Sequence, residues 1–256
     1  MMNITNKNYF TEYQKQIGHQ IGQLIKDFGF EKINDNLGYH VQASAVYSSN
    51  IEGNSIDLNS FMNYKLSKQI KHPQKEIQEI ENLIAAYEFA QNNVLTENNL
   101  LNCHTIFSKT LVSASNRGKY RNEKVGVFGQ DGLVYLAVEQ ELVKENMSLF
   151  FKEINELLNT DISTEEVFYF ASFIHLVFAH IHPFRDGNGR AARLIEKWFL
   201  TQKLGDLFWN IPSEKYYKEN KNEYYKNINL GVNFYELNYD TCIHFLSMLP
   251  KCLEKF

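Results

Sequence analysis

The chain has 256 residues, with 26 lysines and arginines against 30 acidic residues and a net charge of −4. This balance excludes the basic footprint of a protein that binds nucleic acid or an anionic membrane by charge alone. Hydrophobic residues make up 44% and charged residues 22% of the chain, which indicates a globular protein with a sizeable core. Three scattered cysteines exclude a disulfide scaffold and a four-cysteine zinc site, and they suit a reducing cytoplasm.

The sequence carries no recognisable signal for secretion, membrane insertion or lipid attachment. Residues 1–19 are polar and lack the apolar stretch of a signal peptide. The apolar segment Val167–Phe184 has no Asp, Glu, Lys or Arg, but its far end holds histidines and a proline and is too polar for a lipid span. We therefore interpret it as a buried core helix, expect no membrane partner and predict a cytoplasmic location.

Helical spacing of apolar residues dominates the chain. It predicts helices at about 13–28, 39–52, 75–93, 96–111, 141–158, 164–182, 190–204, 213–230 and 239–249. Ser163 and Glu166 form a capping box in front of the most apolar of these helices, which Pro183 ends. Because that helix is hydrophobic on all sides, we expect it at the centre of the domain.

Only residues 120–137 depart from helical spacing. Apolar residues alternate there on both sides of Gln130-Asp131-Gly132, which predicts a small β-hairpin. No linker or change of composition marks a second domain. We therefore predict a single all-α domain over residues 1–256 with one hairpin.

The segment from His182 to Arg193 carries the residue types of a catalytic site. A glycine-flanked loop leads directly into a helix N-terminus, where backbone N–H groups and the helix dipole favour an anion. Arg190 and Arg193 are about one turn apart, so both can face that anion. Asp186 would repel an anion by itself but suits a divalent metal that bridges phosphates, and His182 suits proton transfer near neutral pH.

This segment has simpler interpretations than a metal–polyphosphate site with a base. A Gly-Asn-Gly loop between helices is often only a turn, but a base, an acid, glycines and two arginines within twelve residues favour the chemical interpretation. His180 and His182 could form a metal pair, yet no third ligand has a suitable spacing. We therefore interpret His180 as a core residue at the end of its helix.

The same segment resembles, residue for residue, the signature of Fic-domain proteins, His-x-Phe-x-Asp/Glu-Gly-Asn-Gly-Arg-x-x-Arg. All eight fixed positions agree. Gly118-Lys119-Tyr120-Arg121, followed by Val125-Gly126-Val127, is similar to the start of the family's flap hairpin. Tyr224-Tyr225 falls where the family has a late aromatic pair. The resemblance implies a Fic core at about 97–204 and a flap at about 120–137.

A second motif upstream, Ser48-Ser49-Asn50-Ile51-Glu52-Gly53, is similar to the inhibitory motif Ser/Thr-x-x-x-Glu-Gly/Asn of that family. Ser48 and Glu52 share a helix face, and the dipole disfavours a carboxylate in the last turn, which suggests a cationic partner elsewhere in the fold. The resemblance implies that this partner is Arg193 and that residues of about 39–53 form an inhibitory helix. The alternative is an ordinary solvated helix face.

Members of the family mostly transfer AMP from ATP to a hydroxyl side chain of a target protein. The resemblance implies that His182 deprotonates that hydroxyl and that Phe184 anchors the loop in the core. It further implies a nucleotide site in which Asp186 binds Mg²⁺ and the phosphates are held by Gly187, Asn188, Gly189 and Arg190. Arg193 would bind the γ-phosphate unless Glu52 occupies it. Tyr224 would line the adenine pocket.

The sequence departs from the family pattern in three places. Tyr135–Glu139 stands where a Pro-Pro pair often follows the flap, which affects target docking. No winged-helix module follows the last predicted helix, so we expect no binding to DNA. Gly189 replaces the lysine of Doc-like relatives, which argues against their phosphorylating geometry.

The sequence thus predicts an autoinhibited protein adenylyltransferase that uses ATP and Mg²⁺. Two alternatives stay open: a nucleotide-binding regulator without catalysis, and transfer of another nucleoside monophosphate, such as UMP, on the same scaffold. The expected partners are target proteins with an acceptor hydroxyl and the chain itself through automodification. Formation of a homodimer is a further alternative, and nucleic acid is not an expected partner.

Overall fold

The computed structural model describes residues 3–30, 37–67, 73–129 and 132–254. They form helices and one two-stranded antiparallel sheet, which confirms the predicted all-α class with a hairpin. Most of the buried hydrophobic residues form one cluster, whose members range from Ile4 to Leu253. Within the described part of the chain, no helix combines the length and the apolar character that crossing a bilayer requires.

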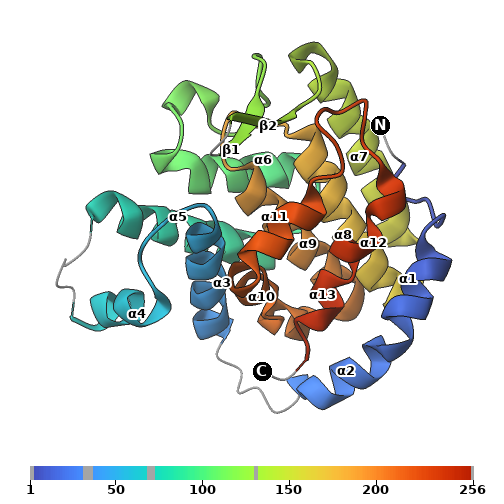
Figure 1. Cartoon of the computed structure of the whole chain (residues 1–256). Helices are drawn as coiled ribbons and strands as arrows, with labels where there is room; N and C mark the ends of the chain where they lie inside the picture. Colours follow the sequence, from blue (N-terminus) through green and yellow to red (C-terminus); the bar gives the residue numbers. More distant parts are fainter. Residues whose placement is uncertain (1–2, 31–36, 68–72, 130–131, 255–256) are drawn as a thin grey trace.

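Two central helices, α8 (Thr164–Ile181) and α9 (Asn188–Leu204), pack against each other in the middle of the molecule (Figure 1). Helix α8 begins at the predicted capping box, in which the Ser163 hydroxyl accepts from the Glu166 N–H and the Glu166 carboxylate accepts from the Ser163 N–H. Its side chains are buried on all sides, as expected for a core helix. The loop between α8 and α9, together with the start of α9, is the segment from His182 to Arg193 that carries the predicted catalytic residues.

The N-terminal region contains α1 (Phe10–Gln16) and α2 (Ile21–Phe28), which pack against α8. The sequence predicted a single helix here. The chain instead leaves the helical conformation at Ile17, whose φ is −144°, and makes a short 3₁₀ turn through Gly18, a residue of low helix propensity. The predicted end at Gly29 is confirmed, because this glycine takes the left-handed conformation.

Helix α3 (Leu37–Ile51) packs against α5 (Gln74–Gln91) and contains Ser48 of the predicted inhibitory motif, while Glu52, predicted in its last turn, lies just after its end. In the chain, α3 and α5 are separated by α4 (Leu58–Ser67), which lies on the outer side of the molecule (Figure 1). The sequence did not predict this helix. Its apolar residues are too few for a clear period, but Asp57 accepts a hydrogen bond from the Ser60 N–H at its start. That capping pair was the local signal for this helix.

The next part of the chain contains α6 (Glu97–Phe107), the hairpin and α7 (Gln140–Asn159). Strands β1 (Gly126–Gly129) and β2 (Gly132–Leu136) pair antiparallel, with Val127 opposite Tyr135 and a shift of register before Phe128. The predicted hairpin is therefore confirmed, while the residues at its tip, 130–131, lie outside the described residues.

The C-terminal helices lie across one face of α8 and α9 (Figure 1). They are α10 (Ser213–Glu219), α11 (Lys221–Ile228), α12 (Ile243–Leu246) and α13 (Met248–Lys251). The sequence predicted two continuous helices. The first breaks at Asn220, whose φ of −109° and ψ of 38° lie outside the helical region, while its side chain donates to the Tyr216 carbonyl. The second breaks before α13 because Pro250 has no N–H to continue α12.

Candidate active site

His182 ends helix α8 in a left-handed conformation, with φ 53° and ψ 56°. Among the described residues it alone has a positive φ without being glycine, and such a conformation costs a β-carbon-bearing residue roughly 1 kcal/mol or more. Two contacts hold the loop beyond it in place. The Phe184 ring is fully buried and stacks on the His104 ring, with the ring centroids 3.8 Å apart. The Asn188 side chain accepts from the Phe184 N–H and donates to the Phe184 carbonyl.

The hydrogen bonds of His182 determine which ring nitrogen can act as a base. Nδ1 lies 3.1 Å from the carbonyl oxygen of Ala179, which only accepts, so Nδ1 carries the proton in the neutral ring. Nε2 is left with its lone pair. Burial lowers the pKa of His182 below its ordinary 6.5, although the Ala179 carbonyl opposes this shift. The imidazole is therefore neutral and able to accept a proton near pH 7.

The N-terminus of α9 has the backbone features that the predicted anion site needs. Gly187 precedes the helix with φ 86°, and a β-carbon at this position would lie 2.7 Å from the Phe107 ring, so both conformation and packing require glycine. The first N–H groups of a helix have no partner within the helix. Together with the helix dipole they favour negative charge at this point.

Glu52 places a carboxylate at that N-terminus. A β-carbon on Gly189 would lie only 2.2 Å from Glu52 Oε1, which shows how closely the carboxylate approaches the first turn of α9. Arg193, fully buried in the next turn, donates from Nη2 to Glu52 Oε1 at 2.7 Å. Arg193 also donates from Nε to the Ser48 hydroxyl at 2.9 Å and from Nη2 to the Ser48 carbonyl. The predicted pairing of the two motifs is present in the structure.

The electrostatics of the site favour the ionised form of Glu52. Burial would raise the pKa of its carboxyl, but Arg193 and Arg190 more than offset this, and the pKa lies below its ordinary value. The Glu52 side chain is 25% exposed at the edge of the site, whereas the Arg193 side chain is completely covered. A solvated helix face, the simpler interpretation of Ser48 and Glu52, does not describe this contact.

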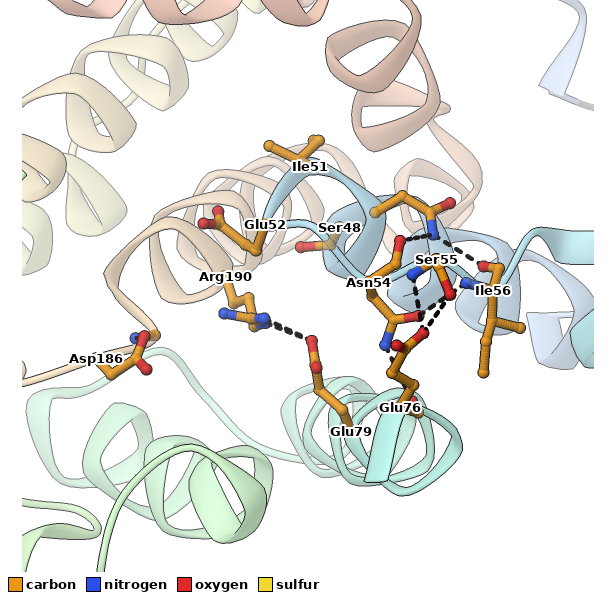
Figure 2. Close-up of polar contacts among 12 residues, drawn as sticks. Ser48, Ile51, Glu52, Asn54, Ser55, Ile56, Glu76, Glu79, Asp186 and Arg190 are labelled. Carbon is orange, nitrogen blue, oxygen red and sulfur yellow. Dashed lines mark hydrogen bonds and ion pairs between the residues drawn. The ribbon is translucent and has the colours of Figure 1, made fainter. Parts of the chain in front are cut away.

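Arg190 and Arg193 have different partners. The Arg190 guanidinium donates from Nε and Nη2 to Glu79 Oε1 of α5, and both side chains are about one-tenth exposed or less (Figure 2). Arg190 thereby connects α9 to α5, while Arg193 connects α9 to α3. The expectation that Arg190 also cradles a phosphate stays a prediction.

The end of α3 is fixed by hydrogen bonds that the sequence analysis did not anticipate (Figure 2). The Asn50 side chain donates to the carbonyls of Asn54 and Ile56. The Asn54 side chain accepts from the Ile56 N–H and donates to the Glu76 carbonyl at 3.0 Å, and the Glu76 carboxylate accepts from both the N–H and the hydroxyl of Ser55. These contacts attach the chain just after Glu52 to helix α5 and so hold the carboxylate in position.

Asp186 lies in the loop and is exposed, and its Oδ1 accepts from the Gly187 N–H at 2.6 Å. No group of three or more His, Cys, Asp or Glu side chains among the described residues could hold a metal ion. One free carboxylate oxygen beside a helix N-terminus fits Mg²⁺, which commonly binds through one or two carboxylates together with substrate phosphates and water. Asp186 is thus suited to a metal that arrives with a nucleotide.

A cavity of about 600 Å³ lies beside His182, within the size range of small-molecule sites. It is lined by the end of α3, the flap, the loop, the start of α9 and helix α11; its residues include Glu52, Val127, Tyr135, His182, Asn188, Gly189, Lys221, Tyr224, Tyr225 and Asn229. Tyr224 lies on this cavity, and its hydroxyl accepts from Arg193 Nη1 at 3.2 Å. That its ring lines an adenine pocket stays a prediction. The hydroxyl of Tyr225 donates to the Ile51 carbonyl at 3.1 Å.

His180 belongs to the core, as the sequence analysis interpreted it. Nε2 donates to the Ile228 carbonyl at 2.8 Å and Nδ1 accepts from the Tyr239 hydroxyl at 2.9 Å, so both ring nitrogens are already occupied. Burial lowers the pKa of His180 to about 4. The ring is therefore neutral and has no nitrogen left for a metal.

Two residues that position the loop were missed. Arg121 was noted only as part of the flap motif, yet its Nε donates to the His182 carbonyl at 2.8 Å and its Nη2 to the Val138 carbonyl. His104 donates from Nε2 to the Asp186 carbonyl at 3.1 Å, while its Nδ1 accepts from the Gly118 N–H. No local pattern indicates either contact, because the partners lie 61 and 82 residues away in the sequence.

A helical domain in which a histidine and a glycine-bounded helix N-terminus share one cavity, with a buried arginine in the next turn of that helix, has the parts of an enzyme that acts on a phosphate group. The comparisons with known proteins agree. Residues 94–200 match the model of the Fic/DOC family. The chain thus contains a Fic/DOC domain over these residues, and Fic-domain proteins are in general transferases of nucleoside monophosphates.

Solved structures share this fold. A Fic family protein from Desulfovibrio desulfuricans is 24% identical, with a TM-score of 0.77 over 94% of this chain and 71% of that one. A Fic domain containing signaling protein from Bacteroides thetaiotaomicron is 17% identical, with a TM-score of 0.71 over 91% of this chain and 92% of that one. Fic-1 from C. elegans is also 17% identical, with a TM-score of 0.71 over 96% of this chain and 71% of that one. No curated protein matches the sequence.

Proposed function

We propose that this protein is an autoinhibited protein adenylyltransferase, which transfers AMP from ATP to a hydroxyl side chain of a target protein and of itself. The observation that carries the proposal is the arrangement of His182. Its Nδ1 proton is bound to the Ala179 carbonyl, and the ring lines a cavity that ends at the N-terminus of α9. A base and an anion site thus share one cavity, which is what attack of a hydroxyl on a phosphate requires.

The proposed reaction assigns a separate role to each part of the site. The acceptor hydroxyl gives its proton to His182 Nε2, its oxygen forms a bond to the α-phosphorus, and the bond from that phosphorus to the bridging oxygen breaks to release pyrophosphate. The N–H groups at the start of α9 and the Arg193 guanidinium bind the phosphate oxygens. Mg²⁺, when bound with the nucleotide, would neutralise phosphate charge, and Asp186 is the residue suited to hold it.

The proposed inhibition follows from charge and position. The Glu52 carboxylate is bound to Arg193 and lies against Gly189. A nucleotide phosphate would need the Arg193 guanidinium and the helix N-terminus at Gly189 for its own binding. While the carboxylate stays there, ATP can bind, but its γ-phosphate lacks Arg193 and the α-phosphate is not aligned for attack. Release of α3 from Arg193 would then permit transfer.

The proposal is tested with ATP labelled in either its α- or its γ-phosphate and with the Glu52→Gly variant. Adenylyl transfer labels the protein, or a band in a native lysate, from the α-phosphate and not from the γ-phosphate. Labelling from the γ-phosphate would indicate a kinase, and binding of ATP without labelling would indicate a regulator without catalysis. Competition by GTP, UTP and CTP determines which nucleoside monophosphate is transferred.

A further inference from the structure

Four buried polar side chains form a row behind Arg193, on the side away from Glu52. The Tyr224 hydroxyl lies 3.2 Å from Arg193 Nη1 and 2.9 Å from His175 Nε2. His175 Nδ1 lies 2.8 Å from Glu196 Oε2, and the Tyr217 hydroxyl donates to the same carboxylate at 2.9 Å. None of these side chains is more than 2% exposed. They come from four helices, α11, α8, α9 and α10.

The direction of every hydrogen bond in this row follows from Arg193. A guanidinium only donates, so the Tyr224 oxygen must accept from it, and the proton of Tyr224 needs an acceptor of its own. His175 Nε2 is the atom within reach, so it carries the lone pair, and the ring proton lies on Nδ1. That proton is donated to the Glu196 carboxylate, which accepts from Tyr217 as well. Glu196 therefore sets the tautomer of His175, and His175 sets the direction of the Tyr224 hydroxyl.

The contacts of Arg193 show why this direction matters. Among the described residues, the Arg193 guanidinium donates to Ser48 of α3, to Glu52 just after α3, and to the Tyr224 hydroxyl. In the active state proposed above, α3 has withdrawn from the guanidinium. The Tyr224 hydroxyl is then the protein group that still orients Arg193.

We infer that His175 is a positioning residue for nucleotide binding: through Tyr224 it holds the Arg193 guanidinium toward the γ-phosphate once Glu52 has left. This inference rests on the proposed function, in which Arg193 binds that phosphate. It assigns a role to a histidine that lies on the core face of α8 and does not line the cavity. The alternative is that the row only satisfies buried polar groups and stabilises the fold.

The two roles differ in their effect on ATP compared with ADP. ADP has no γ-phosphate, so misorientation of Arg193 weakens the binding of ATP alone. A purely structural role would change the stability of the fold or weaken both nucleotides together. The ratio of the two dissociation constants therefore distinguishes them, and it is measured by binding rather than by transfer.

Three substitutions, each in the Glu52→Gly background, separate the links of the row. Tyr224→Phe removes the hydroxyl and keeps the ring that lines the cavity. In His175→Asn the terminal amide takes the place of Nδ1, so it can still donate to Glu196, but no atom reaches Tyr224. In His175→Gln the terminal amide takes the place of Nε2 and its oxygen can accept from Tyr224. The asparagine and glutamine variants are therefore a matched pair.

The experiment measures dissociation constants of ATP and ADP with Mg²⁺ by calorimetry, together with the melting temperature of each variant. Tyr224→Phe and His175→Asn are expected to weaken ATP binding by roughly three- to tenfold, the equivalent of one hydrogen bond, and to leave ADP binding unchanged. His175→Gln is expected to restore most of the preference for ATP. If His175→Asn does not fold, Tyr224→Phe carries the same test.

Each outcome bears on a different proposal. An unchanged ATP-to-ADP ratio in Tyr224→Phe and His175→Asn, or equal weakening of both nucleotides, would overturn the role of His175 and leave the proposed transfer intact. Failure of the Glu52→Gly protein to bind ATP would overturn both. AMP transfer by Glu52→Gly, with a ratio that falls in His175→Asn and recovers in His175→Gln, supports both.

Discussion

Glu52 and Arg193 are 141 residues apart in the sequence, and their side chains meet at 2.7 Å at the N-terminus of α9. The carboxylate lies against Gly189, the arginine is completely buried, and the Ser48 hydroxyl holds the same guanidinium. A carboxylate thus lies where the helix dipole and the unpaired N–H groups favour an anionic ligand. This relationship makes the inhibitory hypothesis directly testable.

Glu52→Gly is expected to raise automodification strongly, because it frees Arg193 and the anion site. Arg193→Ala is not expected to do so, since it removes the partner of Glu52 and the γ-phosphate ligand together. The double variant should resemble Arg193→Ala, because residues that act as a unit are not additive. Labelling from α-labelled ATP at matched protein concentration measures all three.

The matched control for this substitution is Glu219→Gly, which removes an exposed carboxylate from the end of α10. It should change stability by no more than a few tenths of a kcal/mol and leave labelling at the wild-type level. Equal labelling of wild type and Glu52→Gly, at saturating ATP and Mg²⁺, would return Ser48 and Glu52 to the status of an ordinary helix face.

His182→Ala is expected to abolish transfer by the Glu52→Gly protein and to leave ATP binding nearly intact. A general base acts on the transition state, and its loss typically costs about 10²–10⁴ in rate. Single-turnover labelling and ATP affinity, measured side by side, provide the check. His244→Ala, on the exposed side of α12, is the control and should retain full activity. Transfer at an undiminished rate by folded His182→Ala protein is the result that contradicts the mechanism.

The pH dependence of transfer reports on His182. Burial lowers its pKa below 6.5, with Arg121 acting in the same direction and the Ala179 carbonyl, Glu52 and Asp186 opposing. A base with a lowered pKa stays neutral and competent as the pH falls to 6.5, and loses activity only below that value.

We therefore expect the acidic limb of kcat/KM for Glu52→Gly to have its midpoint below pH 6.5. Removal of Glu52 takes away a charge that raises this pKa, so the direction holds in the variant. Rates between about pH 5 and 8, with the folded fraction followed by circular dichroism, test it. A midpoint at or above pH 7 would mean that another group limits the reaction.

Two substitutions of Asp186 separate metal binding from loop structure. Asp186→Asn keeps an oxygen that can accept from the Gly187 N–H, whereas Asp186→Ala does not. Both are expected to lose most Mg²⁺-dependent transfer, because both lack the negative charge. Only the alanine variant should also loosen the loop, seen as a lower melting temperature. Full activity of the wild-type or Glu52→Gly protein in excess EDTA would give Asp186 another role.

Breaking the pair of Arg190 with Glu79 is expected to destabilise the fold. Both side chains are largely buried, and Glu79→Ala leaves the guanidinium without its partner, a change that typically costs about 3–5 kcal/mol. Glu88→Ala, an exposed carboxylate on the same helix α5, should cost less than about 0.5 kcal/mol. Urea unfolding of the two variants measures the difference. Similar free energies of unfolding would show that α5 does not depend on this pair.

Much of the fold could be predicted because its signals act over a few residues. The capping box of Ser163 and Glu166, the left-handed Gly29 and the alternation on either side of Gly132 each specify local conformation through nearest neighbours. Helix α4 and the breaks at Ile17 and Asn220 were missed. There the apolar period was weak or continued through the break.

The features of the candidate site likewise fall into those that local sequence predicts and those that depend on tertiary packing. From the sequence alone one could predict that a base, an acid, two glycines and two arginines occupy one loop and the start of the next helix, since all lie between His182 and Arg193. It also predicted that Glu52 needs a distant cation, and the choice of Arg193 came from resemblance. Three contacts depend on how the chain packs: Arg190 with Glu79, Arg121 with the His182 carbonyl, and His175 with the Tyr224 hydroxyl. The reason is that a buried donor takes the acceptor that chain packing brings within about 3 Å, and no spacing in the sequence encodes that distance.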